Sequence, residues 1–446
     1  MKRTIIKNAN IINDKKIFES DILIEDAFIT KISKSISPSY TNTKIIDAEG
    51  NFVMPGIIDD QVHFREPGLT HKGNIYSESR AAVAGGITSY FEMPNTHPNT
   101  TTIEELNKKF DIAKENSIAN FSFMFGGTNS NLEEILKTNI TEIPAIKLFL
   151  GSSTGNMLVD DPNSLEDIFS NVEIPIAVHC EDEEIIKHNL KLHIDTFGEN
   201  IPISYHPKIR SEEACFTSSS MAIKLAKKTG ARLHVFHLST AKELDLFSNK
   251  LPLKEKKITS EVCIHHLSFS DADYEKFGSK IKWNPSIKTS NDRDMLWDAL
   301  NNDIIDVVAT DHAPHTSEEK MNPYTSCPSG GPLIQHSLVS MLEAFHQEKI
   351  SLQKIVQKMC HNPAILFDIS KRGYISEGFY ADLVIFDIKN PWKVSKDNLI
   401  YKCNWSPFEN KTFKSRILHT LVNGNLVFSN GKIIESATGM KINFDR

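Results

Sequence analysis

A short apolar run, residues 53–58, leads into the stretch Asp59-Asp60-Gln61-Val62-His63-Phe64-Arg65-Glu66-Pro67-Gly68. The run has the length and composition of a buried strand, so the reactive residues behind it lie where that strand ends. An imidazole, a guanidinium and carboxylates are thus grouped at one strand end. A fold that gathers several such ends in one place would make this group part of a functional site.

The same pattern recurs along the middle of the chain. Eight short apolar runs, partly β-branched, cover residues 57–59, 89–92, 120–125, 145–149, 175–179, 232–237, 258–262 and 306–310. Longer helical patterns lie between them, at residues 77–84, 103–115, 212–229 and 291–300 among others. Eight βα units over roughly 250 residues match a (β/α)₈ barrel, although a doubly wound sheet shows the same alternation.

The positions of the reactive residues distinguish these two folds. Polar or ionisable residues follow several of the runs within a few positions: His63, Asn95, Lys147, His179, His237 and Asp311. The carboxyl ends of all barrel strands meet at one mouth, so these side chains would share a pocket there. We therefore predict the α/β class with a (β/α)₈ TIM-like barrel. His234 has the opposite strand parity to His237, so we expect it to point toward the helical layer.

The two ends of the chain differ from its middle. Alternating apolar and polar runs, typical of half-buried strands, occur in residues 1–54 and resume after about residue 373. We predict one small β-sandwich domain formed by both termini, residues 1–54 and 373–446, beside a metal-dependent barrel of residues 55–372. Helical patterns at 333–345 and 351–359 are expected to pack outside the barrel.

Composition argues against several classes of partner. The 446 residues carry a formal net charge of -7 with acidic and basic residues mixed, so we expect neither nucleic acid nor an anionic membrane as a partner. The N-terminus lacks the apolar segment of a signal peptide, no window approaches a membrane span, and the six cysteines form no CxxC pair. We expect a cytoplasmic protein with reduced, mostly buried thiols.

Lys147 stands in an apolar run that should be buried. A buried, unpaired ammonium is costly, so either its pKa falls or the lysine is modified. Reaction of the neutral amine with carbon dioxide would give a carbamate, whose two oxygens could bridge two metal ions. The alternative is a salt bridge to Asp311 or to a nearby glutamate.

Histidines and an aspartate at one mouth suit a borderline divalent metal such as zinc. A single strand-end histidine is more often a hydrogen-bonded core residue than a ligand, so this prediction depends on the joint placement of the three. A carboxylate beside the metal can ligate it and also accept the proton of a bound water. That double role is the one we expect for Asp311.

Arg65 indicates the charge of the substrate. Its guanidinium, two residues beyond His63, would place a bidentate receptor for a carboxylate near the metal. The alternative is an ion pair with Glu66 or Asp60. Asn95 could donate its amide to the same carboxylate, or merely cap a turn.

The motifs taken together resemble those of a known family. They are Gln61-Val62-His63-Phe64-Arg65-Glu66-Pro67-Gly68, Met93-Pro94-Asn95-Thr96, Lys147-Leu148-Phe149-Leu150-Gly151-Ser152-Ser153-Thr154-Gly155, Val178-His179-Cys180-Glu181, His237-Leu238-Ser239-Thr240 and Thr310-Asp311-His312-Ala313-Pro314-His315. They look like the motifs of the dihydroorotases, which are cyclic amidases of the amidohydrolase superfamily. Gly378-Phe379-Tyr380-Ala381-Asp382-Leu383-Val384 resembles the C-terminal β-domain of that superfamily, so the resemblance covers nearly the whole chain.

The resemblance implies an activity. It is the reversible cyclisation of N-carbamoyl-L-aspartate to L-dihydroorotate and water in de novo pyrimidine (UMP) biosynthesis, with a metal-activated hydroxide and Asp311 as general base and acid. One or two zinc ions are implied: His63 and Asp311 would hold one, His179 and His237 the other, and a carboxylated Lys147 would bridge them.

Substrate-binding residues follow from the same resemblance. Arg65, Asn95 and His315 match positions that bind the substrate carboxylate, and Asn284 matches one that contacts the ring. The partner would be this small anionic substrate, and we expect a homodimer or larger homo-oligomer.

Gln61 departs from the family pattern. The family usually has His-x-His at the first strand end, and a glutamine amide is a poorer zinc ligand than imidazole. We expect a weakened first metal site and retained chemistry. Two alternatives stay open: another cyclic amidase of the hydantoinase, dihydropyrimidinase or allantoinase kind, which Arg65 argues against, and a catalytically silent scaffold that binds another pathway enzyme.

Overall fold

The computed structural model describes residues 2–38, 43–151, 157–435 and 438–446. Residues 152–155, which belong to the Lys147 motif, lie outside these ranges. Within them, no helix combines the length and the apolar character needed to cross a membrane.

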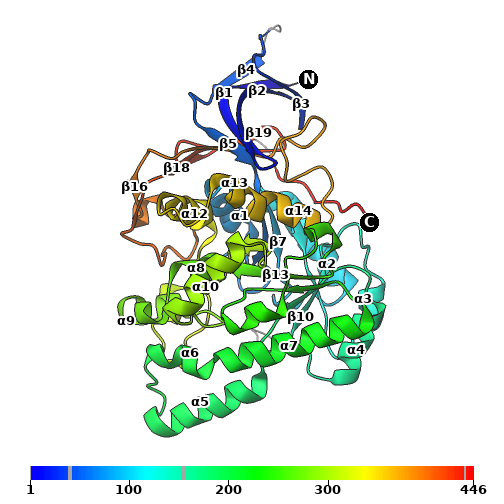
Figure 1. The fold of residues 1–446 in the computed structure, drawn as a ribbon, viewed down its shortest axis with the longest axis vertical. Coiled ribbons are helices and arrows are strands. Elements are labelled where there is room, and N and C mark those ends of the chain that lie inside the picture. The colour runs from blue at the N-terminus through cyan, green and yellow to red at the C-terminus, as the bar shows by residue number, and fades with distance from the viewer. Residues whose placement is uncertain (1, 39–42, 152–156, 436–437) are drawn as a thin grey trace.

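A barrel of parallel strands forms the middle of the molecule (Figure 1). Its strands are β6 (Ile57–Val62), β7 (Ile87–Glu92), β8 (Asn120–Phe123), β9 (Phe125–Gly126), β10 (Ile146–Phe149), β11 (Ile176–His179), β12 (Leu233–Val235), β13 (Ile258–Cys263) and β14 (Val307–Ala309). All eight predicted strands are confirmed, with the third divided at Met124 into β8 and β9. Val62 pairs with His312, beyond β14, so the last strand lies beside the first and the barrel closes.

Helices cover the outside of this barrel (Figure 1). They are α1 (Ile75–Ala84), α2 (Ile103–Asn116), α3 (Leu132–Leu136), α4 (Pro162–Asn171), α5 (Glu183–Phe197), α6 (His206–Ile209), α7 (Glu212–Thr229), α8 (Ile264–Ser268), α9 (Tyr274–Phe277), α10 (Ser290–Asn301), α11 (Ser317–Lys320), α12 (Ser337–His346), α13 (Leu352–Val356) and α14 (Asn362–Leu366). The four helices predicted between strands correspond to α1, α2, α7 and α10. Helix α7 ends at Gly230, whose φ of 78° is one that glycine adopts without strain.

Both ends of the chain contribute to one sheet of nine strands above the barrel (Figure 1). The strands are β1 (Arg3–Asn13), β2 (Lys16–Glu25), β3 (Phe28–Ser33), β4 (Thr43–Asp47), β5 (Phe52–Pro55), β15 (Leu383–Asp387), β18 (Arg416–Val422), β19 (Asn425–Ser429) and β20 (Lys432–Ile433). Strand β5 pairs with β1 and with β15, so it joins the N-terminal and C-terminal strands. An apolar core of its own, which includes Ile11, Ile24 and Leu383, stabilises this sheet.

The last residues of the chain leave this sheet and return to the barrel. Lys441 bridges Phe121 of β8, and Ile442 and Phe444 are buried in the apolar cluster inside the barrel. Arg446 donates to the carbonyl of Pro144, just before β10. The tail therefore lies at the amino ends of the strands, opposite the mouth.

The prediction for His234 is wrong. Its side chain is fully buried and lies edge-on to Phe236 and Phe367, which belong to the cluster inside the barrel, rather than facing the helices. The parity argument fails because His237 has a φ of 40°, outside the strand region, so the alternation that relates the two histidines does not extend to it.

Candidate active site

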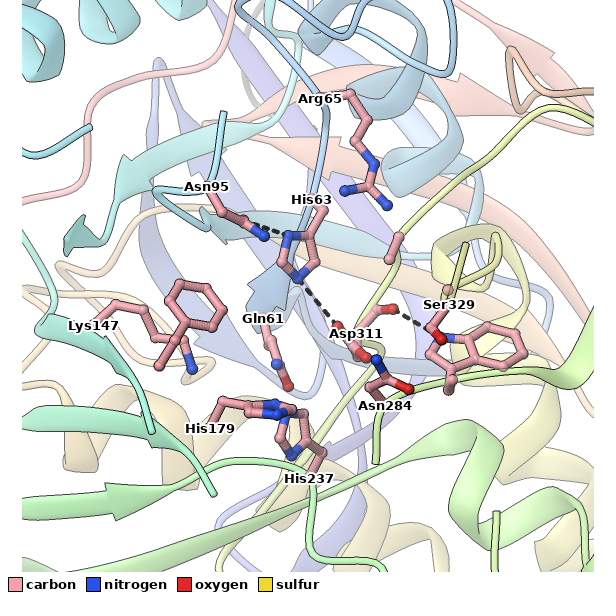
Figure 2. Close-up of a pocket in the computed structure, with 14 residues that line it drawn as sticks. Gln61, His63, Arg65, Asn95, Lys147, His179, His237, Asn284, Asp311 and Ser329 are labelled. Atoms are coloured by element: carbon pink, nitrogen blue, oxygen red, sulfur yellow. Dashed lines mark hydrogen bonds and ion pairs between the residues drawn. The ribbon is translucent and has the colours of Figure 1, made fainter. Parts of the chain in front are cut away.

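A cavity of about 70 Å³ opens at the carboxyl ends of the barrel strands (Figure 2). Its lining comprises Gln61, His63, Arg65, Asn95, Lys147, Phe149, His179, His237, Trp283, Asn284, Asp311, Ala313, Ser329 and Gly330. Every residue predicted for the site lines this cavity except His315, which lies behind Arg65. Convergence of parallel strand ends therefore places these side chains together, as the sequence predicts.

His63, just beyond β6, is held from both sides. Its Nδ1 lies 2.9 Å from Asn95 Oδ1, and its Nε2 lies 3.2 Å from Asp311 Oδ1. Because the amide oxygen can only accept, Nδ1 carries the proton and Nε2 presents its lone pair. Burial, followed by the nearby Arg65 charge, lowers the pKa of His63 well below its usual value. The neutral ring is the form that binds metal ions.

His179 and His237 lie on neighbouring strand ends and face each other. His179 Nδ1 is 2.9 Å from His237 Nε2, and His179 Nε2 is 3.0 Å from Glu181 Oε2. Burial lowers the pKa of both imidazoles, most strongly that of His237. Two neutral rings with converging nitrogens can hold one metal ion.

Lys147 is buried and has no ion-pair partner among the residues that the structure describes. Its side chain is 0% exposed, and its Nζ has no hydrogen-bond partner among the described residues. The ammonium position lies over the rings of Phe149 and Phe236, at 4.6 and 4.3 Å from their centroids. Burial lowers its pKa to about 7. The salt bridge considered from the sequence is therefore not formed, and a neutral amine is accessible near neutral pH.

Asp311 is the carboxylate of the mouth. Burial raises its pKa to about 7, although His179, Arg65 and Lys147 act in the opposite direction. A carboxyl group that titrates near neutrality can both accept and release a proton. Its φ of 46° and the φ of 71° at Arg65 are strained values for residues other than glycine, of a kind that concentrates at functional sites.

Arg65 provides positive charge at one side of the cavity (Figure 2). Its Nε donates to the Pro314 carbonyl at 3.0 Å and its terminal nitrogen lies 3.0 Å from His315 Nε2. Burial lowers its pKa only to about 10, so the guanidinium stays charged at neutral pH. The ion pairs with Glu66 or Asp60 considered from the sequence do not form among the described residues.

Gln61 lies between Lys147 and Asp311 in Figure 2. The pairing of β6 with β7 shifts between Asp59 and Val62, which indicates a bulge at residues 60–61. Gln61 Oε1 is 3.6 Å from the Cys263 thiol. An amide therefore lines the cavity together with the donor set.

This donor set fits a divalent metal ion. Neutral imidazoles and a carboxylate are the ligand types that zinc prefers. Lys147 Nζ is buried and has no hydrogen-bond partner within the described ranges, as expected of a group that is modified or bound to an ion.

Several residues of the site were not anticipated from the sequence. Glu181 pairs with His179 and with Arg210, and Phe149, Trp283, Ser329 and Gly330 line the cavity. The sequence contained a signal for Glu181, because it lies only two residues beyond the predicted ligand His179, at the same strand end. Trp283 and Ser329 come from loops whose paths depend on packing far along the chain, so no local pattern marks them.

Comparisons with known proteins give the family. The sequence profile described as "Amidohydrolase family" matches residues 52–427. The chain is 32% identical to the dihydroorotase of Methanosphaera stadtmanae over 432 residues, covering 96% of each chain. It is 29% identical to the allantoinase of Desulfitobacterium hafniense over 443 residues, covering 98% of this chain and 97% of the other.

A solved structure confirms the fold. The L-hydantoinase of Arthrobacter aurescens superposes with a TM-score of 0.91 at 28% identity, covering 97% of this chain and 98% of that one. The predicted α/β class with a TIM-like barrel is therefore confirmed; where a β-sandwich was predicted, the strands of both termini form one sheet of nine strands.

Proposed function

Because this chain belongs to the amidohydrolase family and is a hydrolase that acts on cyclic amides, we propose that it interconverts N-carbamoyl-L-aspartate and L-dihydroorotate. In this reaction the ring amide forms with loss of water, and hydrolysis reverses it. The product would enter pyrimidine biosynthesis. The relatives include both dihydroorotases and allantoinases, so the substrate has to be inferred from the residues of the site.

The observation that carries the proposal is the buried charge of Arg65. Both N-carbamoyl-L-aspartate and L-dihydroorotate bear a carboxylate that a guanidinium can bind through paired hydrogen bonds. Allantoin, hydantoin and dihydrouracil bear no carboxylate. A buried arginine on the cavity wall would be left without a counter-ion by those substrates, which is unfavourable.

Neighbouring polar groups support the same substrate. Asn95 accepts the His63 Nδ1–H through its oxygen, so its amide nitrogen is free to donate to a carboxylate. His315 lies 3.0 Å from the Arg65 guanidinium, where it would orient it. Asn284 Oδ1 is buried without a hydrogen-bond partner in the described structure and would accept from a ring N–H.

The donors gathered at the mouth support a set of metal-binding residues. We assign His63 and Asp311 to one ion and His179 and His237 to the other, with Lys147 as the bridging ligand once it is carboxylated. Zinc bound there would supply Lewis acidity, which polarises the amide carbonyl and makes a water molecule acidic at neutral pH. Gln61 leaves the first of these positions with one imidazole instead of two, so we expect it to bind metal more weakly.

Asp311 would transfer the proton. In hydrolysis its carboxylate accepts a proton from the attacking water and delivers it to the ring nitrogen that leaves when the C–N bond breaks. In cyclisation the carboxylate takes the proton from the attacking ureido nitrogen and passes it to the departing carboxylate oxygen, which leaves as hydroxide and takes a second proton from solvent to become water. A pKa near 7 suits both directions.

The test is a comparison of substrates with the purified, zinc-loaded protein. We expect opening of L-dihydroorotate and cyclisation of N-carbamoyl-L-aspartate, and no turnover of allantoin. Turnover of allantoin in preference would overturn the proposal in favour of an allantoinase. Absence of all turnover in the presence of zinc and bicarbonate, with activity appearing in a Gln61→His variant, would identify a silent scaffold.

A further inference from the structure

A second group of potential ligands lies inside the barrel, deeper than the mouth. Asp60 of β6, His234 of β12 and Glu261 of β13 bring their ligand atoms within 4.8 Å of one another. All three side chains are 0% exposed. None of the three belongs to the residues assigned above to catalysis or to the metal ions of the mouth.

Four atoms of this group are buried without a hydrogen-bond partner in the part of the chain that the structure describes. They are both carboxylate oxygens of Asp60, the Nε2 of His234 and the Oε2 of Glu261. Buried polar atoms are nearly always satisfied, and leaving one unsatisfied costs about 1–3 kcal/mol, more when it is charged. Four such atoms in one buried group, with no hydrogen bond to any described residue, point to a further partner.

The spacing of these atoms matches a coordination shell better than a set of hydrogen bonds. His234 Nε2 lies 3.4 Å from Asp60 Oδ2 and 3.7 Å from Glu261 Oε2. Good hydrogen bonds between such groups are about 2.7–3.2 Å long. A tetrahedron with metal–ligand bonds of about 2.1 Å has edges of about 3.4 Å. A small adjustment of the side chains would therefore place an ion at bonding distance from all of them.

The hydrogen bond on the other side of His234 orients the ring for such a role. His234 Nδ1 lies 2.9 Å from Thr259 Oγ1, and this hydroxyl donates to the Leu233 carbonyl at 3.2 Å. The hydroxyl proton is thereby engaged, so the oxygen accepts from Nδ1–H. This arrangement orients Nε2 toward the two carboxylates, and metal-binding histidines are likewise oriented by a neighbour that holds the second nitrogen.

Charge supports the same conclusion. Neither Asp60 nor Glu261 forms an ion pair with a lysine or arginine within the described ranges, where the charged partner of each is His234. Two carboxylates in a dry interior are costly unless a cation balances them. One divalent ion would neutralise both, and a histidine with carboxylates is a ligand set that zinc accepts.

We propose that Asp60, His234 and Glu261 form a separate structural binding site for one zinc-type divalent ion inside the barrel. Asp60 contributes two oxygens, and the other residues contribute one atom each. The site touches the mouth through Glu261, whose Oε1 accepts from the His237 amide at 3.2 Å and from the Cys263 thiol at 3.3 Å. An ion there would hold Glu261 in place, together with the His237 backbone and the Cys263 thiol that contacts Gln61.

The test measures metal directly, so its result does not depend on the proposed reaction. Crystals of the zinc-loaded protein should give an anomalous difference peak at the zinc edge between the three side chains, distinct from any peak at the mouth. The Asp60→Asn variant should lose this peak and about one equivalent of zinc per chain, while any peak at the mouth persists. Asp59→Asn is the matched control, because Asp59 is equally buried but is bound by Thr310, and it should keep the peak.

Two results would overturn the proposal. One is a zinc-saturated crystal with no anomalous peak between Asp60, His234 and Glu261; the group would then be an imidazolium shared by two carboxylates. The other is an unchanged zinc content in Asp60→Asn. If that variant does not fold, the anomalous difference map of the unaltered protein is sufficient to test the proposal.

Discussion

Burial, more than chemical type, determines the pKa values of the ionisable residues in this site. Lys147 is an ordinary lysine placed where its ammonium finds no partner among the described residues, so its pKa falls to about 7 and its amine becomes reactive. Asp311 is an ordinary aspartate whose pKa rises to about 7 because it too is buried. Both groups are thereby brought to the pH range in which an enzyme of a neutral compartment works.

Arg65 should govern substrate affinity. We expect Arg65→Met to raise the KM for L-dihydroorotate roughly 10- to 100-fold, because a charged hydrogen-bond pair contributes about 1.5–3 kcal/mol. The zinc content should not change. Steady-state kinetics and metal analysis of the same preparation check this. Arg80→Met, which removes an arginine bound to Glu435 away from the cavity, serves as the control, and a normal KM in Arg65→Met would refute the carboxylate-binding role.

Asp311 should govern the rate of the chemical step. We expect Asp311→Asn to lower kcat about 10²- to 10⁴-fold, because the amide cannot accept the proton that the reaction transfers. Circular dichroism should show a folded protein, and metal analysis should show the ion at His179 and His237 retained. Turnover within a few-fold of the unaltered enzyme would contradict the proton-transfer role.

Gln61 should limit metal retention at the mouth. The Gln61→His variant replaces an amide by the better zinc ligand, so we expect it to require a roughly tenfold higher concentration of chelator before it loses its metal. Gln61→Ala is the control and should show no gain. Equal loss of metal from Gln61→His and the unaltered protein would show that residue 61 does not reach the ion.

At the scale of elements, the carboxyl ends of the strands determine the site. Strand β11 ends at His179, and Glu181 two residues later pairs with Arg210, which directly follows α6. Glu181 is fully buried; burial raises its pKa, but Arg210 and then His179 outweigh this and lower it to about 2. This ion pair therefore attaches the segment after α6 to the mouth.

The Glu181 pair predicts an acid-dependent stability. Because the folded-state pKa lies below the unfolded value of about 4.5, the stabilisation, about 3 kcal/mol, is complete above that value and is lost as pH falls toward 2. The difference in free energy of unfolding between the unaltered protein and Glu181→Gln should shrink by about 1.4 kcal/mol per pH unit below pH 4.5.

Urea unfolding at pH 7, 5, 4 and 3.5 measures this difference. Glu184→Gln, which removes a carboxylate from an exposed ion pair with Lys187, is the control and should leave stability nearly unchanged at every pH. A difference for Glu181→Gln that does not depend on pH would refute the ion-pair explanation.

The elements also show which features the sequence predicts and which it does not. Buried apolar runs bounded by helices predict all eight barrel strands, because burial on both faces leaves a continuous apolar signal. The bulge at residues 60–61 and the positive φ of His237 carry no such signal, since they arise from packing between strands. For that reason the direction of His234 could not be inferred from parity.

At the scale of the whole molecule, the barrel gathers residues from five separate parts of the sequence. Residues 63, 147, 179, 237 and 311 lie at its carboxyl mouth, while the C-terminal tail covers the amino ends of the strands. The residues predicted for the site, apart from His315, therefore line one cavity, because parallel strands determine where their ends lie whatever the loops do. The loop residues Trp283, Ser329 and Gly330 depend on long-range packing and were not predicted.

The most direct test compares two substrates that differ only in the carboxylate. L-dihydroorotate and dihydrouracil share the same ring, and dihydrouracil lacks the group that Arg65 would bind. The proposed function predicts a kcat/KM for ring opening that is roughly 100-fold or more higher for L-dihydroorotate, from the charged hydrogen bonds that dihydrouracil cannot form. An equal or higher kcat/KM for dihydrouracil would show that the buried arginine does not select the substrate, and would contradict the proposal.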